Sequence, residues 1–323
     1  MKILLFPRTS RDTEALARSL LPEGMEMVAV DRGAGDEVLI DALASCDVLM
    51  GFILQPLSEQ VVRAMGCLKL VQLLSAGYEG VDLKAMRDMG VPVATNGAAN
   101  AVGVAEHAIL LMMAVMRNLV YLDTQAKAGR WRPGGLDALK LYELDGKTVG
   151  IVGLGAIGRE TAKRLKPFCV TTLYCGRRRA EEAVEKELEV TYTSLDELLR
   201  VSDVVTLHVP LNDSTFHMIG REQLRAMKRS AVLINTCRGG VVDTDALYEA
   251  LKEGIIAGAG LDTLEQEPPP ADLPILSLPN VTITPHLSGV TVESWTKRMI
   301  LAFANIQRLA NDEKPLWLVP ELR

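Results

Sequence analysis

Aromatic residues are scarce in this chain of 323 residues, where Phe, Trp and Tyr together make up 4%. The interior must therefore be aliphatic, and apolar residues as a whole reach 48%. Interiors of Val, Ile, Leu and Ala suit helices packed on a buried parallel sheet. A chain of this length predicts about two domains, and it can bury enough surface to need neither a disulfide nor a metal for stability.

Long apolar runs and cysteine pairs are also missing. The longest apolar run, residues 108–116, is far shorter than the ~20 residues that a membrane-spanning helix needs. The apolar run at the start of the chain is too short for a signal peptide. The five cysteines form no C-x-x-C pair and are odd in number, which is typical of reduced thiols in the cytoplasm. We therefore expect a cytoplasmic protein with no membrane partner.

Positive charge is in slight deficit, with 35 Lys and Arg against 41 Asp and Glu and a net charge of −6. Nucleic-acid binding needs a basic surface to meet the phosphates, so nucleic acid is not an expected partner. The four histidines include no pair at metal-ligand spacing, and no metal site is predicted.

Short apolar segments and amphipathic stretches alternate along the first third of the chain. The apolar segments predict strands at residues 2–6, 25–30, 47–52, 69–74 and 91–95. The stretches between them predict helices at residues 13–21, 37–45, 58–65 and 82–89. Alternation at this spacing is typical of a parallel sheet with helices on both faces.

A second alternation begins near residue 147. It predicts strands at residues 148–152, 170–174, 204–208, 231–235, 256–260 and 281–284, with helices between them. Ser194 followed by Glu197 is a capping box, which marks the start of one of these helices. The predicted fold class is therefore α/β, with two doubly wound parallel sheets.

Two further helices stand outside this alternation. Residues 101–118 carry almost no charge apart from Glu106 and His107, so this helix should be deeply buried, inside a domain or between subunits. The last helix, residues 292–309, follows the second sheet, and its apolar positions need a surface to cover. These positions are Trp295, Met299, Ile300, Phe303 and Ile306. We expect the N-terminal domain to supply that surface, so that residues 1–98 and 290–323 form one domain and residues 99–289 the other.

A glycine-rich segment follows the first strand of the second alternation. Its residues are Gly153, Leu154, Gly155, Ala156, Ile157 and Gly158, and a predicted helix follows. Between a strand and a helix, the G-x-G-x-x-G pattern indicates dinucleotide binding. The first glycine permits a tight turn, the second lets the pyrophosphate approach the backbone, and the third lets helix and strand pack closely. The alternative is a strand-to-helix turn that binds no ligand.

The next predicted strand ends just before Gly176, where such folds commonly place an acidic residue that binds the adenine ribose. No carboxylate is present here, and Arg177, Arg178 and Arg179 follow. Because guanidinium groups suit a 2′-phosphate, NADP is favoured as the cofactor, with NAD as the alternative. The arginines could also form a solvated basic loop without a ligand.

Three further side chains with catalytic potential follow strands of the second sheet. They are Arg238, Glu267 and His286. In an open parallel sheet, ligands bind outside the carboxyl ends of the strands. There Arg238 can hold a carboxylate, and His286 can transfer a proton near neutral pH with Glu267 as its partner. Taken singly, each residue could equally be a surface ion pair, a solvated acid or a helix-start histidine.

Seven segments, in this order, closely resemble the D-2-hydroxyacid dehydrogenase family over nearly the whole chain. They are residues 74–82 (LSAGYEGVD), 100–107 (NAVGVAEH), 153–158 (GLGAIG), 208–211 (HVPL), 235–243 (NTCRGGVVD), 260–268 (GLDTLEQEP) and 284–289 (TPHLSG). The resemblance implies a flavodoxin-like substrate domain, a Rossmann cofactor domain and an active site in the cleft between them. It also implies a homodimer, built through the helix that carries Glu106 and His107.

The resemblance also assigns roles to residues. Arg238 would bind the substrate carboxylate and carbonyl, and His286 would be the general acid/base paired with Glu267. Asp262 would hold the nicotinamide carboxamide. The substrate-binding residues would be Leu54, Ala76, Gly77, Tyr78 and Asn100, with the carboxylate on the amides of Ala76 and Gly77. The cofactor-binding residues would be Gly153, Gly155, Ala156, Ile157, Gly158, Gly176, Arg177, Arg178, His208, Val209, Pro210, Thr236, Cys237 and Asp262.

We therefore expect an NADPH-preferring reductase that converts 2-oxo acids, such as glyoxylate or hydroxypyruvate, into D-2-hydroxy acids. Formate dehydrogenases are similar but carry glutamine where this chain has Glu267, and phosphite dehydrogenases carry lysine where it has Ala76. Both enzyme alternatives are disfavoured. An alternative from another class is an NAD(P)-sensing binding protein of the corepressor type, which resembles this family and keeps its Arg, Glu and His.

Overall fold

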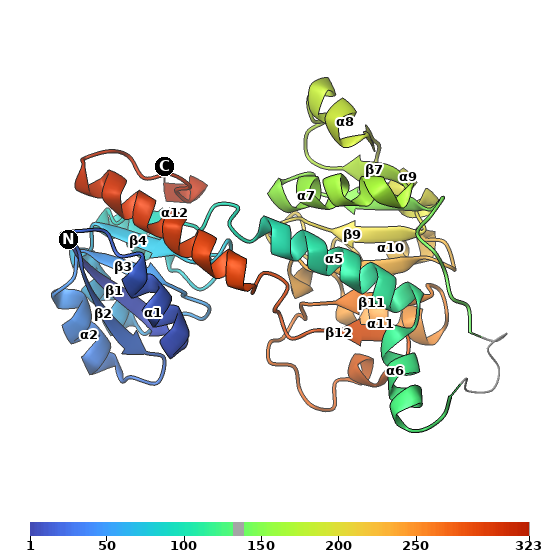
Figure 1. Cartoon of the computed structure of the whole chain (residues 1–323), viewed down its shortest axis with the longest axis horizontal. Helices are drawn as coiled ribbons and strands as arrows, with labels where there is room; N and C mark the ends of the chain where they lie inside the picture. The colour runs from blue at the N-terminus through green and yellow to red at the C-terminus, as the bar shows by residue number, and fades with distance from the viewer. Residues whose placement is uncertain (132–138, 323) are drawn as a thin grey trace. The chain divides into compact units, whose positions relative to one another are not determined.

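The computed structural model describes residues 1–131 and 139–322, and the chain divides into two compact units. Unit 1 comprises Met1–Asn100 and Thr291–Arg323, and unit 2 comprises Ala101–Val290. The sequence placed these divisions after residues 98 and 289. Each unit is a parallel sheet with helices on both of its faces (Figure 1).

The sheet of unit 1 has five parallel strands in the order β2-β1-β3-β4-β5. Their bounds are β1 (Lys2–Arg8), β2 (Glu26–Asp31), β3 (Val48–Gly51), β4 (Leu70–Leu73) and β5 (Val93–Ala94). This order is that of flavodoxin-like folds. In β1, Ile3 and Leu5 face one side of the sheet while Leu4 and Phe6 face the other, and all four side chains are buried. Burial on both sides explains why the strand reads as a continuous apolar run.

Helices cover both faces of this sheet. On one face lie α1 (Arg11–Ser19) and α12 (Val292–Ala310), and on the other lie α2 (Asp36–Ala44), α3 (Glu59–Ala64) and α4 (Leu83–Met89). Figure 1 shows α12 running along the sheet of unit 1, although it is nearly two hundred residues from β5 in the sequence. Helix α12 therefore belongs to the same compact unit as residues 1–100.

The apolar stripe of α12 is narrower than the sequence suggested. Met299, Phe303 and Ile306 are 0%, 3% and 0% exposed, but Ile300 is 51% exposed. The expectation for Ile300 was wrong, because one residue advances a helix by about 100° and carries Ile300 past the edge of the stripe. Trp295 packs edge-to-face on Phe52, with ring centroids 5.6 Å apart. The helix begins at a capping box formed by Thr291 and Ser294.

The sheet of unit 2 has seven parallel strands in the order β12-β11-β10-β9-β6-β7-β8, which is a Rossmann order extended by one strand. Their bounds are β6 (Thr148–Val152), β7 (Thr171–Cys175), β8 (Val190–Tyr192), β9 (Val204–Leu207), β10 (Val232–Asn235), β11 (Gly258–Leu261) and β12 (Val281–Ile283). The sequence did not predict β8, a three-residue strand at the edge of the sheet. Only one of its side chains is buried, so it has no apolar pattern to recognise.

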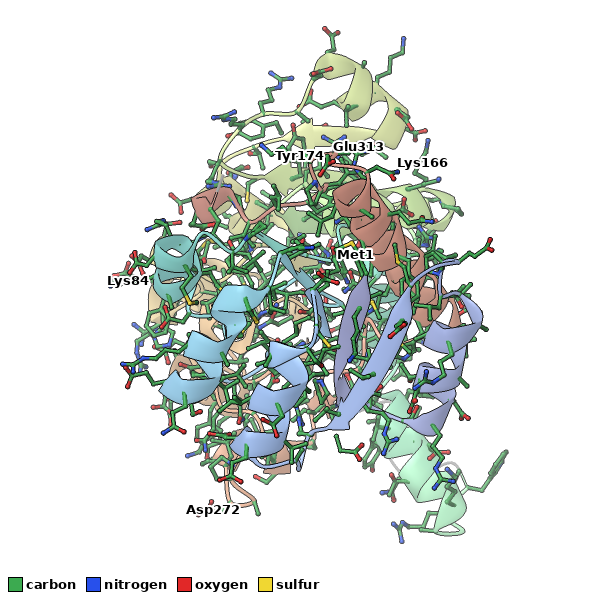
Figure 2. The ribbon with its side chains drawn as sticks, turned by 90° about the vertical axis from the view of Figure 1, so that its left-hand side faces the viewer. Met1, Lys84, Lys166, Tyr174, Asp272 and Glu313 are labelled. Carbon is green, nitrogen blue, oxygen red and sulfur yellow. The ribbon has the colours of Figure 1, made fainter. Side chains whose placement is uncertain are left out.

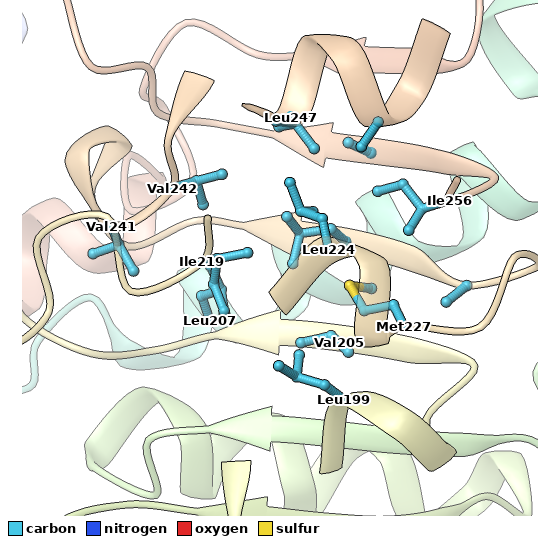
Figure 3. Close-up of a cluster of buried hydrophobic side chains, with 14 of the residues drawn as sticks. Leu199, Val205, Leu207, Ile219, Leu224, Met227, Val241, Val242, Leu247 and Ile256 are labelled. Carbon is cyan, nitrogen blue, oxygen red and sulfur yellow. The ribbon is translucent and has the colours of Figure 1, made fainter. Parts of the chain in front are cut away.

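One face of this sheet is covered by α5 (Ala101–Met116) and α7 (Ala156–Leu165). The other is covered by α9 (Leu195–Val201), α10 (Arg221–Ala226) and α11 (Thr244–Lys252). Figure 3 shows side chains of these three helices, among them Leu199, Leu224 and Leu247, gathered over the strands. Only half of the predicted capping box is present: the Ser194 hydroxyl accepts a hydrogen bond from the Glu197 amide at 3.2 Å, whereas the Glu197 carboxylate binds Arg200.

Helix α5 packs unusually close to β11. A Cβ atom on Gly258 would lie 2.7 Å from Val115, and one on Gly260 would lie 2.9 Å from Leu111, so both strand positions need glycine. The helix is buried along most of its length, but Leu110 and Met113 are exposed in this single chain. No single helix among the described residues is long and apolar enough to cross a membrane. Helix α5 and the following α6 (Leu119–Lys127) together meet that test but bend by 63°.

The helix predicted over residues 101–118 ends earlier than expected. Asn118 has a left-handed backbone (φ 48°), and α6 (Leu119–Lys127) starts in a new direction with no buried residue. No proline or glycine marks this break in the sequence.

Side chains are drawn in Figure 2, where Lys84 of α4 and Asp272, both exposed, project at the periphery.

A pair of α12 variants tests the packing of unit 1. Phe303→Ala removes a buried ring and should lower the free energy of unfolding by about 3–5 kcal/mol. The matched variant Ile300→Ala, at an exposed position of the same helix, should change it by less than about 0.5 kcal/mol. Urea unfolding followed by circular dichroism measures both, and equal losses would contradict the observed orientation of α12.

Candidate active site

The glycine-rich turn between β6 and α7 has the geometry that its sequence predicted. Gly153 has φ +99°, and a Cβ atom there would lie 2.5 Å from the carbonyl oxygen of His208. A Cβ atom on Gly158 would lie 2.1 Å from the carbonyl oxygen of Gly153. By contrast, a Cβ atom on Gly155 would meet nothing within 4 Å. The turn is therefore closed on the inside and open in front of α7.

This opening fits a dinucleotide pyrophosphate. Helix α7 has ten residues, and Gly155 at its N-cap provides no side-chain capping bond, so Ala156, Ile157 and Gly158 begin the helix with N–H groups directed at the opening. The partial positive charge of the helix terminus favours an anion at this position.

Buried polar atoms next to this turn also fit a ligand. Within the described residues, His208 Nδ1, Thr236 Oγ1 and Thr263 Oγ1 are buried and have no hydrogen-bond partner. Each follows the carboxyl end of a strand: β9, β10 and β11, respectively. Burial lowers the pKa of His208 to about 3, so the ring is neutral. Buried polar groups are nearly always satisfied, so a bound polar ligand at this edge would complete the set. The sequence had pointed to His208 and Thr236 but missed Thr263.

Other predicted cofactor residues have different surroundings. Val209 and Pro210 follow His208 and are at least partly accessible. Cys237 is buried, and both its amide and its thiol bond to the Asn235 side chain, at 3.0 and 3.1 Å. Cys237 therefore shapes the loop after β10 through internal bonds.

The segment after β7 separates the three arginines. Gly176, Arg177 and Arg178 are exposed, and within the described part of the chain neither Arg177 nor Arg178 makes an ion pair. Arg179 is different, because its guanidinium donates two hydrogen bonds to the Glu185 carboxylate, at 2.9 and 2.8 Å. Two of the three arginines are thus available for a ligand.

His286 and Glu267 form the central pair of the site. His286 Nδ1 lies 2.6 Å from Glu267 Oε2, and Glu267 Oε1 accepts a hydrogen bond from the Leu264 amide at 3.0 Å. The His286 backbone is left-handed (φ 54°), and its amide bonds to the carbonyl oxygens of Asp262 and Thr284. The ring therefore has one nitrogen held by a carboxylate and the other, Nε2, directed away from it.

Arg238 lies close enough to influence Glu267. The loop after β10 packs tightly on the loop after β11, since a Cβ atom on Gly239 would lie 1.9 Å from the backbone of Leu264. Partial burial raises the pKa of Glu267, but the hydrogen bond and charge of His286, the Leu264 amide and the charge of Arg238 outweigh it and lower the pKa overall. Glu267 is thus a carboxylate at neutral pH, and the structure brings all three predicted catalytic residues together.

Asp262 holds the loop that carries His286. Its carboxylate is 1% exposed and accepts hydrogen bonds from the Thr284 hydroxyl (2.6 Å), the Leu287 amide (3.0 Å) and the Ser288 amide (2.9 Å). His107 Nε2 lies 2.9 Å from the Thr284 hydroxyl, which links α5 to this network. Burial raises the pKa of Asp262, but these hydrogen bonds lower it by more, so the pKa of Asp262 lies below the ordinary carboxyl value. Its proposed contact with a nicotinamide carboxamide stays a prediction.

The predicted substrate residues lie in unit 1, in loops after its strands. Leu54 follows β3 and is 59% exposed. Ala76 and Gly77 follow β4, where the Ser75 hydroxyl donates to the Gly77 carbonyl oxygen at 2.7 Å. The Tyr78 hydroxyl donates to the Glu321 carboxylate at 3.3 Å, an internal partner that the sequence did not predict. Asn100 is the last residue of this unit before α5. The expected cleft between the domains stays a prediction.

No group of three or more His, Cys, Asp or Glu side chains is placed to hold a metal ion in the described residues.

The sequence is similar to a family model for the NAD-binding domain of D-isomer specific 2-hydroxyacid dehydrogenases, over residues 109–288. It is 41% identical over 284 residues to a glyoxylate reductase of Korarchaeum cryptofilum, covering 88% of this chain and 85% of that one. The chain belongs to the D-isomer specific 2-hydroxyacid dehydrogenase family. It is accordingly an oxidoreductase that uses a nicotinamide cofactor.

Two further relatives agree with this assignment. A glyoxylate reductase of Thermofilum pendens is 40% identical over 286 residues, covering 88% of this chain and 84% of that one. The crystal structure of a glyoxylate reductase from Paecilomyes thermophila superposes with a TM-score of 0.85 at 28% identity, covering 100% of this chain and 99% of that one. The similarity therefore includes both units of the fold.

The Asp262 network has a pH-dependent contribution to stability. Asp262→Asn replaces an acceptor oxygen by a donor group and should lower the free energy of unfolding by about 2–3 kcal/mol at pH 7. Because the pKa of Asp262 is depressed in the folded protein, its contribution is complete above the ordinary carboxyl pKa near 4 and is lost as the pH falls through the folded value.

Urea unfolding of the parent and of Asp262→Asn at pH 7 and at successively lower pH should therefore show a difference that shrinks below about pH 4. The exposed variant Asp272→Asn is the control and should match the parent at each pH. A constant difference between parent and Asp262→Asn would contradict a charged Asp262.

Proposed function

We propose that this enzyme reduces a short 2-oxo acid, glyoxylate or a close analogue, to the D-2-hydroxy acid with NADPH. The observation that carries this proposal is the 2.6 Å contact between His286 and Glu267, beside the charge of Arg238, at the carboxyl edge of a Rossmann sheet. A proton donor and a carboxylate anchor are the two groups that reduction of a 2-oxo acid needs. The names of the glyoxylate reductases that it resembles support the same substrate class.

The residues divide the work as follows. A nicotinamide cofactor, when bound, would supply the hydride that C2 of the substrate accepts. His286, protonated, donates the proton from Nε2 to the substrate oxygen as negative charge grows there. Glu267 holds Nδ1 and stabilises the imidazolium, so that Nε2 keeps its direction. Arg238 binds the substrate carboxylate and places positive charge beside the developing alkoxide.

Unit 1 would supply the remaining substrate contacts. We assign the carboxylate to the amides of Ala76 and Gly77, in the loop that Ser75 braces, and Leu54, Tyr78 and Asn100 to the substrate pocket. Backbone amides suit a carboxylate because they donate hydrogen bonds to it without any side chain losing conformational entropy on binding.

The choice of NADPH rests on the exposed segment after β7. It offers two arginines and no carboxylate at the position where an acidic residue would bind the ribose of NADH. Arg177 and Arg178 are therefore assigned to the 2′-phosphate.

The enzyme is further proposed to be a homodimer. Apolar side chains left exposed on neighbouring helices favour this state: Leu110 and Met113 on α5, and Leu119, Val120 and Tyr121 on α6. Exposed apolar side chains gathered on consecutive helices are typical of a subunit interface. Light scattering of the purified protein measures the assembly directly.

The alternative activities lack support at particular residues. The Glu267 carboxylate that binds His286 favours a reaction with a proton transfer, unlike oxidation of formate. Ala76 stands where phosphite dehydrogenases carry lysine. A corepressor-type sensor would bind NAD(P) without turnover, and a steady-state assay separates it from an enzyme.

The assay uses a panel of 2-oxo acids with each cofactor. Glyoxylate or hydroxypyruvate with NADPH should turn over, with kcat/KM for NADPH about ten- to a thousandfold above that for NADH, a preference that weakens as salt rises. A neutral aldehyde without a carboxylate is the control and should be a poor substrate. Efficient reduction of that aldehyde would overturn the 2-oxo acid assignment, whereas equal use of NADH would overturn only the cofactor assignment.

Two variants test the proton transfer. His286→Ala should lower kcat for reduction by about 10²–10⁴, the usual contribution of a general acid. Glu267→Gln should keep the fold but lower kcat, because a neutral amide no longer holds Nδ1 with a charge-assisted hydrogen bond. Stopped-flow or steady-state absorbance of the nicotinamide follows both variants, and an unchanged kcat in Glu267→Gln would remove this residue from the mechanism.

A further inference from the structure

A cluster of three side chains lies beneath the segment proposed to bind the 2′-phosphate. Tyr174, the penultimate residue of β7, is fully buried. Its hydroxyl accepts a hydrogen bond from the Ala180 amide at 2.8 Å and donates to Glu185 Oε1 at 2.5 Å. Glu185 lies on α8 (Glu182–Leu188) and is also bound by both ends of the Arg179 guanidinium. The three residues thus join the end of β7, residues 177–179 (the arginine segment) and α8.

The carboxylate of Glu185 is the unusual member of this cluster. It is 8% exposed as a residue, and its hydrogen bonds to Arg179 and Tyr174 outweigh burial and lower its pKa to about 2. It is therefore negatively charged at any pH at which the enzyme works. It bonds directly to Arg179 and is connected to the Ala180 amide by two consecutive hydrogen bonds, so it lies beside the C-terminal end of residues 177–179, at a separation shorter than the Debye length of about 8 Å.

A negative charge at this place opposes the proposed cofactor. An acidic residue near the end of the second Rossmann strand favours the ribose hydroxyls of NADH and repels a 2′-phosphate. An unpaired Glu185 carboxylate would repel the 2′-phosphate in this way. The Arg179 guanidinium neutralises its charge through a bidentate ion pair, the strongest geometry for such a pair.

We infer that Arg179 determines cofactor specificity without touching the cofactor, by neutralising Glu185 so that Arg177 and Arg178 can receive a 2′-phosphate. The inference rests on the proposed preference for NADPH. It separates three adjacent arginines into two that bind the ligand and one positioning residue that acts through a carboxylate. Tyr174 completes the arrangement, because its buried hydroxyl fixes both the Glu185 carboxylate and the far end of the segment.

Binding of nucleotide fragments tests this inference without catalysis. Isothermal titration calorimetry compares adenosine 2′,5′-bisphosphate with adenosine 5′-monophosphate, which differ by the phosphate in question. The preference for the 2′-phosphate is the Kd of the monophosphate divided by the Kd of the bisphosphate. In Arg179→Met this ratio should fall by about three- to tenfold, the effect of one partly screened charge on a phosphate. The fall should shrink as salt rises.

The second variant separates an indirect from a direct role. In Arg179→Met/Glu185→Gln the uncovered charge is gone, so the ratio should return to within about twofold of the parent value. Glu185→Gln alone should keep or increase the parent ratio. Arg200→Met removes a comparable arginine fork, from Glu197 on α9, that has no hydrogen bond to Glu185 or Arg179 among the described contacts, and it should match the parent.

The outcomes are distinct. A ratio that stays low in the double variant would show that Arg179 contacts the phosphate itself and would overturn the inference, as would an unchanged ratio in Arg179→Met. If the parent protein binds both fragments equally, the proposed preference for NADPH is wrong. Failure of that proposal is therefore seen in the parent protein alone and is distinct from failure of the inference on Arg179. Circular dichroism and melting temperature confirm that each variant is folded before titration.

Discussion

The parallel alignment of β10, β11 and β12 is the constraint on which the chemistry of unit 2 depends. Parallel strands end at the same edge, so the segments that follow them are brought together however far apart they lie in the sequence. Arg238, Glu267 and His286 each occupy one of these segments. The buried carboxylate of Asp262 then holds the last of them through the Thr284 hydroxyl and two backbone amides. That anchor, together with the bonds of the His286 amide to two carbonyl oxygens, maintains the left-handed backbone at His286.

Charge in the site is distributed so that each group has a defined state. Glu267 and Asp262 stay ionised because hydrogen bonds outweigh the effect of burial. His208, which has no such partner, becomes neutral through burial. The same balance operates after β7, where Arg179 and Tyr174 keep Glu185 ionised while covering it. His286 differs from His208 in having a carboxylate beside its ring.

Much of the fold could be predicted because it follows from local patterns. Strand–helix alternation indicated both sheets, and the glycine spacing indicated the turn between β6 and α7. Errors arose where the pattern was short or ambiguous. The edge strand β8 buries a single side chain, the break between α5 and α6 carries no proline or glycine, and Ile300 belongs to an apolar run but not to the buried stripe. In each case tertiary packing, rather than local preference, decides the outcome.

The sequence by itself determined the family, the α/β class, the glycine-rich turn and the identity of the arginine, glutamate and histidine, because these depend on residue type and short-range order. Only the tertiary structure decided which atoms meet. The bond from His286 Nδ1 to Glu267 and the network around Asp262 both join separate segments. Folding also buries the Thr263 hydroxyl without a hydrogen-bond partner among the described residues. The three arginines after β7 look equivalent in sequence, and only the folded position of Glu185 on α8 distinguishes Arg179 from its neighbours. Such pairings depend on how the strands align and the helices pack, which local sequence does not specify.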